Sequence, residues 1–174
     1  IRTDFRETIK FELLMQDKTI NDNDKIKIAL NLYYYNPYEI EDIKKAIDDI
    51  LWFYKGGKKD KKIIVDNENN NYNKQKQIYS YEFDAEYIYS AFMEQYKIDL
   101  NSIKYLHWWK FKALFLSLNE EVLFSKIMKY RAMNINTIKD KDMKKFYKKM
   151  KKIYGLPDMR TEEEKENDFA EAFS

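Results

Sequence analysis

The single histidine is the first residue to consider as a catalytic group. His107 is the only histidine among the 174 residues. If it lay on a helix and acted as a general base, it would need a carboxylate or a nucleophile one turn away. Its neighbours at that spacing are Ile103 and Phe111, which can supply neither. We therefore predict that His107 is a core or interface residue rather than a catalytic one.

Neighbouring carboxylates are the second candidate for acid–base chemistry. They occur at Glu41-Asp42, Asp48-Asp49 and Glu120-Glu121. Adjacent side chains of a helix point about 100° apart, so such pairs do not converge on one substrate atom. We interpret all three pairs as solvated surface.

The composition excludes several kinds of site. The chain has no cysteine, which rules out disulfides, iron–sulfur clusters and thiolate-bound zinc. Three glycines are too few for the glycine-rich loops that hold dinucleotides or phosphates. We therefore expect a protein that is not an enzyme and that has neither a metal nor a cofactor.

A lysine-rich stretch near the C-terminus is the strongest local charge pattern. Residues 139–152 contain eight lysines and two aspartates, and their apolar side chains recur at helical spacing. We predict that this stripe is a candidate partner surface, formed by Met143, Phe146, Tyr147 and Met150. Binding to a nucleic-acid backbone is the alternative, but the stretch has no arginine and an acidic segment follows it. Attachment to a membrane surface is less well supported, because aromatic residues are few there.

The dipeptide Trp108-Trp109 is the most distinctive pair of large side chains. Adjacent helical residues diverge, so we predict that one indole lies in the core and the other faces a second helix or a partner. An exposed indole of this pair would be compatible with self-association.

Helical periodicity accounts for most of the chain and predicts an all-α protein. We predict a single compact domain over residues 1–154, with helices at about 4–17, 23–34, 37–55, 84–96, 101–118, 120–133 and 140–154. Asn36 and Pro37 are expected to begin the third helix, and Gly56-Gly57 to end it. No apolar run is long enough to cross a membrane.

Two segments lack helical periodicity. Residues 58–77 are rich in lysine and asparagine, and we expect a mobile loop there with at most a small β-hairpin from residues 63–65 and 78–79. Residues 155–174 carry an excess of acidic side chains and are expected to form a disordered tail.

Several short motifs resemble one protein family. They are the sequences TDFR at 3–6, WFYKGG at 52–57, YEFDAEYIYSAF at 81–92, LHWWKF at 106–111, and Tyr-Arg at 130–131. This pattern is similar to that of small proteins from tailed phages and prophages of low-GC Gram-positive bacteria. The motif positions that we single out are Asp4, Phe5, Arg6, Leu106, His107, Trp108, Trp109, Lys110, Phe111, Tyr130 and Arg131.

The resemblance implies a role in phage tail assembly. It indicates a chaperone-type protein that binds the tape-measure protein, the major tail protein or both, in the cytoplasm of the host bacterium. A short N-terminal segment normally precedes the Asp-Phe-Arg motif in this family, so we expect that native residues are missing before Ile1. The alternatives are a nucleic-acid-binding phage protein that uses residues 139–152, and a structural tail or connector component.

Overall fold

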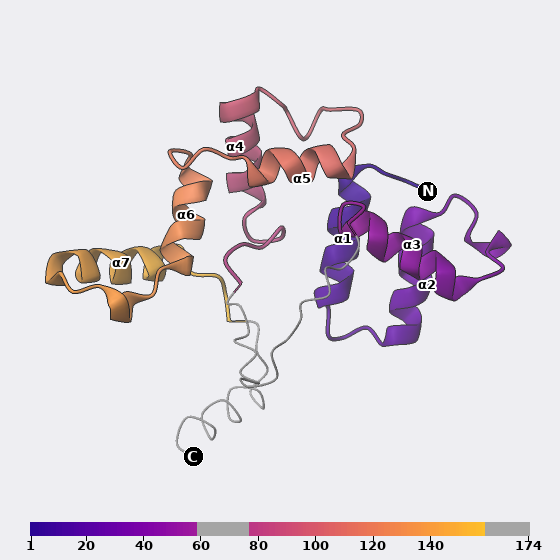
Figure 1. Ribbon diagram of the computed structural model, residues 1–174, viewed down its shortest axis with the longest axis horizontal. Coiled ribbons are helices and arrows are strands. Elements are labelled where there is room, and N and C mark those ends of the chain that lie inside the picture. Colours follow the sequence, from indigo (N-terminus) through magenta and orange to yellow (C-terminus); the bar gives the residue numbers. More distant parts are fainter. Residues whose placement is uncertain (59–76, 159–174) are drawn as a thin grey trace, which may run out of the picture. The chain divides into compact units, whose positions relative to one another are not determined.

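The computed structural model describes residues 1–58 and 77–158, and the regular elements in these ranges are helices joined by turns and irregular segments (Figure 1). In these ranges β-type backbone pairing is limited to one isolated antiparallel bridge between Asp4 and His107. The all-α prediction is therefore confirmed. The elements are α1 (Phe5–Gln16), α2 (Asp22–Tyr33), η1 (Pro37–Glu39), α3 (Ile43–Tyr54), α4 (Ala85–Tyr96), α5 (Trp108–Leu116), α6 (Leu123–Ala132), η2 (Ile135–Thr137) and α7 (Lys141–Ile153), where η denotes a 3₁₀ helix.

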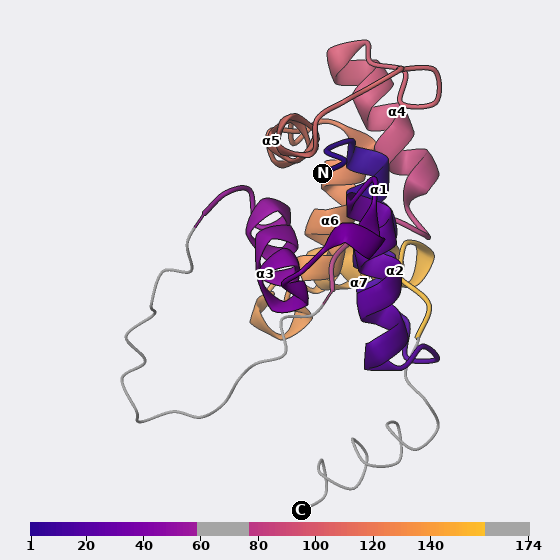
Figure 2. The same cartoon turned by 90° about the vertical axis from the view of Figure 1, so that its right-hand side faces the viewer.

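The described residues form two compact units, which lie within Ile1–Lys126 and Ile127–Ser174. In the first unit α1 packs against α2 and α5, and α2 packs against α3. Helix α5 runs across α4, since Figure 1 shows α5 along its length and Figure 2 shows it end-on beside α4. In the second unit, η2 packs against α7.

Stacked aromatic rings form the centre of the first unit. The ring of Phe111 on α5 stacks on Phe5 of α1 and on Phe92 of α4, with centroid separations of 4.8 and 5.0 Å. All three side chains are buried. Burial of such large apolar rings supplies much of the stabilisation that holds helices together. The core thus joins the N-terminal helix to two helices that follow the undescribed segment.

Four helices begin and end within one residue of their predicted limits, and for three of them the reason is visible at the N-terminus. Asp4, Asn21 and Asp140 each accept a hydrogen bond from a backbone N–H in the first turn of α1, α2 and α7. Such caps are readable from sequence because they use local side chains. Helix α4 also begins directly after Asp84, as predicted, although the Asp84 side chain makes no cap bond there.

The predicted start of the third helix is wrong. Pro37 begins the 3₁₀ turn η1 instead, and Asn36 makes no side-chain cap bond. The α-helix starts six residues later, where the Asp42 side chain accepts a hydrogen bond from Lys45 N at 2.9 Å. Its end is as predicted, because Gly56 and Gly57 have φ values of +84° and +72°, which glycine adopts without a Cβ clash.

The fifth and sixth helices are shorter than predicted. Asp99 caps only a turn, by accepting from Asn101 N and Ser102 N, and α5 starts at Trp108 rather than near residue 101. Asn119 likewise accepts from Glu121 N in a turn before α6, which starts at Leu123. In both cases a short polar side chain forms a local turn that precedes the helix.

Two predicted features lie mainly outside the described residues. Residues 63–65 of the expected hairpin lie outside the described residues. Ile78 and Tyr79 are described and have no strand conformation. Of the expected tail, only residues 155–158 are described. No helix in ranges 1–58 and 77–158 combines the length and apolarity needed to cross a bilayer.

Candidate functional site

The motifs at 3–6, 52–57 and 106–111 meet in the first unit, and we call their contact region the signature junction. Backbone hydrogen bonds join the first and last of these segments. Phe5 N donates to Leu106 O at 2.9 Å, and Trp108 N donates to Thr3 O at 2.8 Å. Residues about a hundred positions apart are thereby fixed to each other at the starts of α1 and α5.

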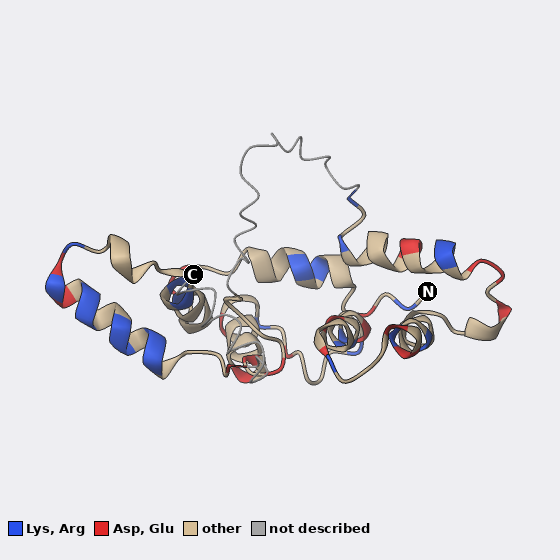
Figure 3. Cartoon of the chain, turned by 90° about the horizontal axis from the view of Figure 1, so that it is seen from below, with Lys and Arg blue, Asp and Glu red and all other residues tan. Residues whose placement is uncertain are grey.

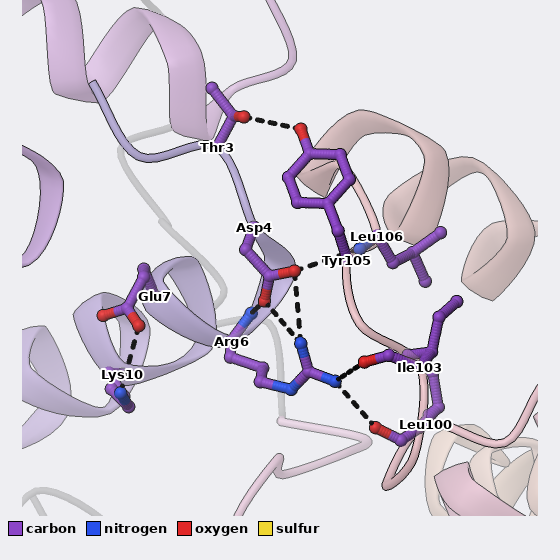
Figure 4. A network of polar contacts seen from close by, with 9 residues as sticks. All are labelled: Thr3, Asp4, Arg6, Glu7, Lys10, Leu100, Ile103, Tyr105 and Leu106. Atoms are coloured by element: carbon purple, nitrogen blue, oxygen red, sulfur yellow. Dashed lines mark hydrogen bonds and ion pairs between the residues drawn. The ribbon is translucent and has the colours of Figure 1, made fainter.

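Asp4 and Arg6 form the polar part of the signature junction (Figure 4). The Asp4 carboxylate accepts from Arg6 N and from Leu106 N, each at 3.0 Å, so it caps α1 and also holds the segment before α5. The Arg6 guanidinium pairs with Asp4 at 3.1 Å. It also donates to the carbonyl oxygens of Leu100 and Ile103. A planar guanidinium can make this set of bonds because its donors point in several fixed directions.

The structure places His107 at the N-terminus of α5. Its Nδ1 atom accepts a hydrogen bond from Trp109 N at 3.1 Å, which makes His107 the N-cap of the helix. The imidazole also makes edge contacts with the rings of Phe53 and Trp109. This capping role was not predicted from the sequence, because histidine is not among the preferred N-cap residues.

Both indoles of the Trp pair bind the C-terminal end of α3. Trp108 Nε1 donates to Tyr54 O at 2.9 Å, and Trp109 Nε1 donates to Phe53 O at 2.8 Å. These carbonyls belong to the last turn of α3, whose C=O groups lack partners within the helix. Trp108 is 2% exposed and Trp109 is 37% exposed. The two side chains therefore reach the same helix end, one from the core and one from the surface.

Gly57 allows Trp109 to approach the end of α3 closely. A Cβ atom on Gly57 would lie 2.8 Å from the Trp109 Cη2 atom, whereas a Cβ on Gly56 would have no atom within 4 Å. The Trp109 ring also stacks on Phe53, with centroids 5.7 Å apart. The motifs WFYKGG and LHWWKF are thus complementary halves of one contact, and Lys110 lies exposed beside it.

Tyr130 and Arg131, in the second unit, hold α7 against the end of α6. Arg131 Nε donates to Tyr154 O at 2.6 Å, and Lys151 Nζ donates to Arg131 O at 3.0 Å. The Tyr130 ring contacts the rings of Phe146, Tyr147 and Tyr154 at centroid separations of 5.9 to 6.0 Å. This motif is therefore part of a separate cluster from the signature junction.

The predicted partner surface on α7 is only partly exposed. Met143 is 49% exposed and Phe146 is 44% exposed, while Tyr147 and Met150 are partly buried. Lysines occupy most of the other positions of the helix and appear as the blue segments of α7 in Figure 3. Within the described ranges, no cluster of three or more histidine, cysteine, aspartate or glutamate side chains has a geometry that could hold a metal ion.

Comparison with known families gives one match, which covers residues 1–156 and carries the description Bacteriophage Gp15 protein. The chain belongs to this Gp15 family. It is therefore a bacteriophage protein, as the resemblance of its motifs implied. No curated protein and no solved structure matches it. The Gp15 match includes every motif position of the signature junction and of the Tyr130-Arg131 cluster.

The acceptors for the Arg6 and tryptophan donors in the signature junction could not be predicted from the sequence. They are backbone carbonyls of residues 53, 54, 100 and 103, and no side-chain pattern reveals them. The only indication in the sequence came from the hydrogen-bond donors of this junction. One guanidinium and two indoles in short motifs predict buried polar contacts, because each carries N–H groups that need acceptors when buried.

Proposed function

We propose that this Gp15 family protein is a phage tail-assembly chaperone that acts in the cytoplasm of the host bacterium. It binds the tape-measure protein, the major tail protein or both, through protein–protein contacts and without catalysis. The observation that carries the proposal is the exposed apolar stripe of α7, bordered by lysines, in a protein of a phage family.

The α7 stripe has the properties of a surface for helical clients. Amphipathic helices bind in apolar surfaces that present anchors at helical spacing, and charged borders set their orientation. Methionine suits such a surface because its flexible thioether adapts to different partners. Met143 and Phe146 remain nearly half exposed on α7, although both are large apolar side chains that folding normally buries.

The signature junction supports the proposal in a different way. Its polar groups are directed at backbone carbonyls of the same chain, as with Arg6 on residue 103 and Trp109 on residue 53. Such bonds fix helices in place rather than bind a substrate. We infer that the junction is a scaffold and that client contacts lie elsewhere.

Co-expression with the tape-measure protein of the same phage tests the proposal. We expect a larger soluble fraction of the tape-measure protein and its co-purification with the chaperone. The double variant Met143→Ser/Phe146→Ser should lose both effects. Leu116→Ser is the matched control, since Leu116 is 74% exposed on α5. If co-expression with the unmodified protein left the solubility of the tape-measure protein unchanged, the proposal would be refuted.

Nucleic-acid binding is the second candidate, and the lysines of residues 139–152 favour it. Backbone binding by lysines depends strongly on salt. A gel-shift titration at low and at high salt therefore separates the two candidates, because a chaperone gives no shift with duplex or single-stranded DNA. A third candidate, a structural tail component, predicts that the protein is present in purified virions.

A further inference from the structure

The apolar face of α7 is divided into two parts. One part faces Tyr130, whose ring contacts the partly buried Tyr147 and Tyr154 and also the ring of Phe146. The other part consists of Met143, Ile153 and the exposed side of Phe146, which are 49%, 55% and 44% exposed. We call these three residues the open strip.

The open strip has the spacing of a helix-binding ridge. Met143 and Phe146 are three residues apart, and Phe146 and Ile153 are seven residues apart. At about 1.5 Å per residue, the strip therefore extends over roughly 15 Å of α7. Residues at this spacing lie on one side of a helix and interdigitate with a similar row on a partner helix.

Positive charge borders the open strip along one side. Lys149 lies three residues after Phe146 and four before Ile153, which places it next to both on the helix surface. Lys145 and Lys152 continue the same row at i−4 and i+3 from Lys149. Asp142, at i−4 from Phe146, is the one acidic neighbour on this border. The border is thus predominantly cationic over nearly the whole strip.

We propose that the open strip binds an amphipathic helix whose apolar ridge is bordered by aspartate and glutamate. The charge of the border determines this choice, because acidic side chains beside the ridge would face Lys145, Lys149 and Lys152. A nucleic-acid backbone would leave the exposed surfaces of Phe146 and Ile153 without an apolar partner. The acidic, amphipathic helix would belong to the client of the proposed chaperone. Only this origin of the helix rests on the proposed function; its chemistry follows from the open strip and its border.

Synthetic helical peptides test the inference with the full chain. One peptide carries leucines at i, i+3, i+7 and i+10 with glutamates beside them. A second replaces the glutamates by lysines, and a third replaces the leucines by serines. We expect fluorescence anisotropy to show binding of the first peptide and at least about tenfold weaker binding of the other two. Equal affinity for all three peptides would overturn the inference.

Variants of α7 locate the binding site. Ile153→Ser removes an exposed anchor, and Lys149→Glu reverses the border charge; each should weaken binding of the acidic peptide about five- to tenfold. Both positions are exposed, so circular dichroism should show an unchanged fold. Leu116→Ser should leave the affinity unchanged. Unaltered binding in both α7 variants, or tighter binding of a DNA oligonucleotide than of the peptide, would overturn the inference.

The two proposals fail in distinguishable ways. Peptide binding without any effect on tape-measure solubility would refute the chaperone function and leave the chemistry of the open strip intact. Improved tape-measure solubility that persists in Ile153→Ser and Lys149→Glu would refute the open strip as the client site and leave the chaperone function intact.

Discussion

Gly57 and Trp109 are so close that no side chain can fit between them, because a Cβ atom on Gly57 would lie 2.8 Å from the Trp109 Cη2 atom. The glycine ends α3, and the tryptophan lies in the first turn of α5. This contact explains why the segment after α3 has a glycine at position 57, opposite the tryptophan at position 109. Gly57 leaves the space that the Trp109 ring fills.

Replacement of the two glycines should separate backbone strain from this contact. Gly56→Ala introduces a Cβ at φ +84° with open space around it, and we expect a loss of about 1 kcal/mol in the free energy of unfolding. Gly57→Ala adds the collision with Trp109, so we expect a loss of about 2–4 kcal/mol. Urea denaturation followed by tryptophan fluorescence measures both values. Equal losses in the two variants would show that the contact between Gly57 and Trp109 does not contribute to the free energy of unfolding.

The two tryptophans should differ in their contribution to stability. Trp108→Phe removes buried volume together with the hydrogen bond to Tyr54 O, so we expect a loss of about 2–3 kcal/mol. Trp109→Phe should cost about 1 kcal/mol or less, because Trp109 is partly exposed and Phe53 O also accepts from Gly56 N. Thermal denaturation by circular dichroism compares the variants. A larger loss for Trp109→Phe would contradict the assignment of Trp108 to the core.

Arg6→Lys tests whether the guanidinium shape is needed. A lysine ammonium can pair with Asp4 but cannot also reach the carbonyl oxygens of Leu100 and Ile103. We expect a loss of about 1–3 kcal/mol in unfolding free energy. Lys10→Gln, which breaks the exposed pair with Glu7, is the control and should change stability by less than about 0.5 kcal/mol. Equal effects would mean that Arg6 acts only as a positive charge.

Glu12 should make stability depend on pH. Burial raises its pKa above the ordinary value of 4.5, and this outweighs the hydrogen bond from the Tyr54 hydroxyl and the nearby charge of Lys112. The folded state therefore binds the Glu12 proton more tightly than the unfolded state does. The contribution of the Glu12 proton to the free energy of unfolding is fully present below pH 4.5. It is lost as the pH rises through the raised pKa of Glu12 in the folded state.

Glu12→Gln isolates this contribution, because glutamine does not titrate and its side-chain carbonyl can still accept from Tyr54. We expect the unfolding free energy of the variant, relative to the unmodified protein, to be higher at pH 7 than at pH 4. Urea denaturation at the two pH values provides the measurement. A relative stability that is independent of pH, or that falls from pH 4 to pH 7, would contradict the burial of the Glu12 carboxylate.

The fold was predictable where short-range signals decide it. Asp4 and Asp140 cap α1 and α7 through their own side chains, and the apolar stripes that follow them have helical spacing. Prediction was wrong at Pro37 and near residue 101, where local signals for a helix start were present. At the second site the backbone of residues 100–106 instead bonds to Arg6, Asp4 and Phe5, partners that lie about a hundred residues away.

The candidate sites also differ in how far they could be predicted from local sequence. The α7 surface was readable from the sequence, since the lysines and the apolar stripe lie on one continuous helix. Periodicity did not reveal that Tyr130 covers part of this stripe, because Tyr130 comes from a different helix. The signature junction was visible only as conspicuous residue types. Its geometry depends on backbone acceptors, which have no sequence signal.

The bridge between Asp4 and His107 also constrains the order in which the chain folds during synthesis. Helix α1 cannot obtain its final contacts until residues 106 and 108 have left the ribosome. At roughly 5–20 residues per second, the intervening hundred or so residues take about 5–20 s to be made. Throughout that interval Phe5 lacks its partner ring Phe111, so the nascent N-terminal half exposes apolar surface. A protein proposed to protect other phage chains from aggregation thus itself passes through a period of vulnerability on the ribosome.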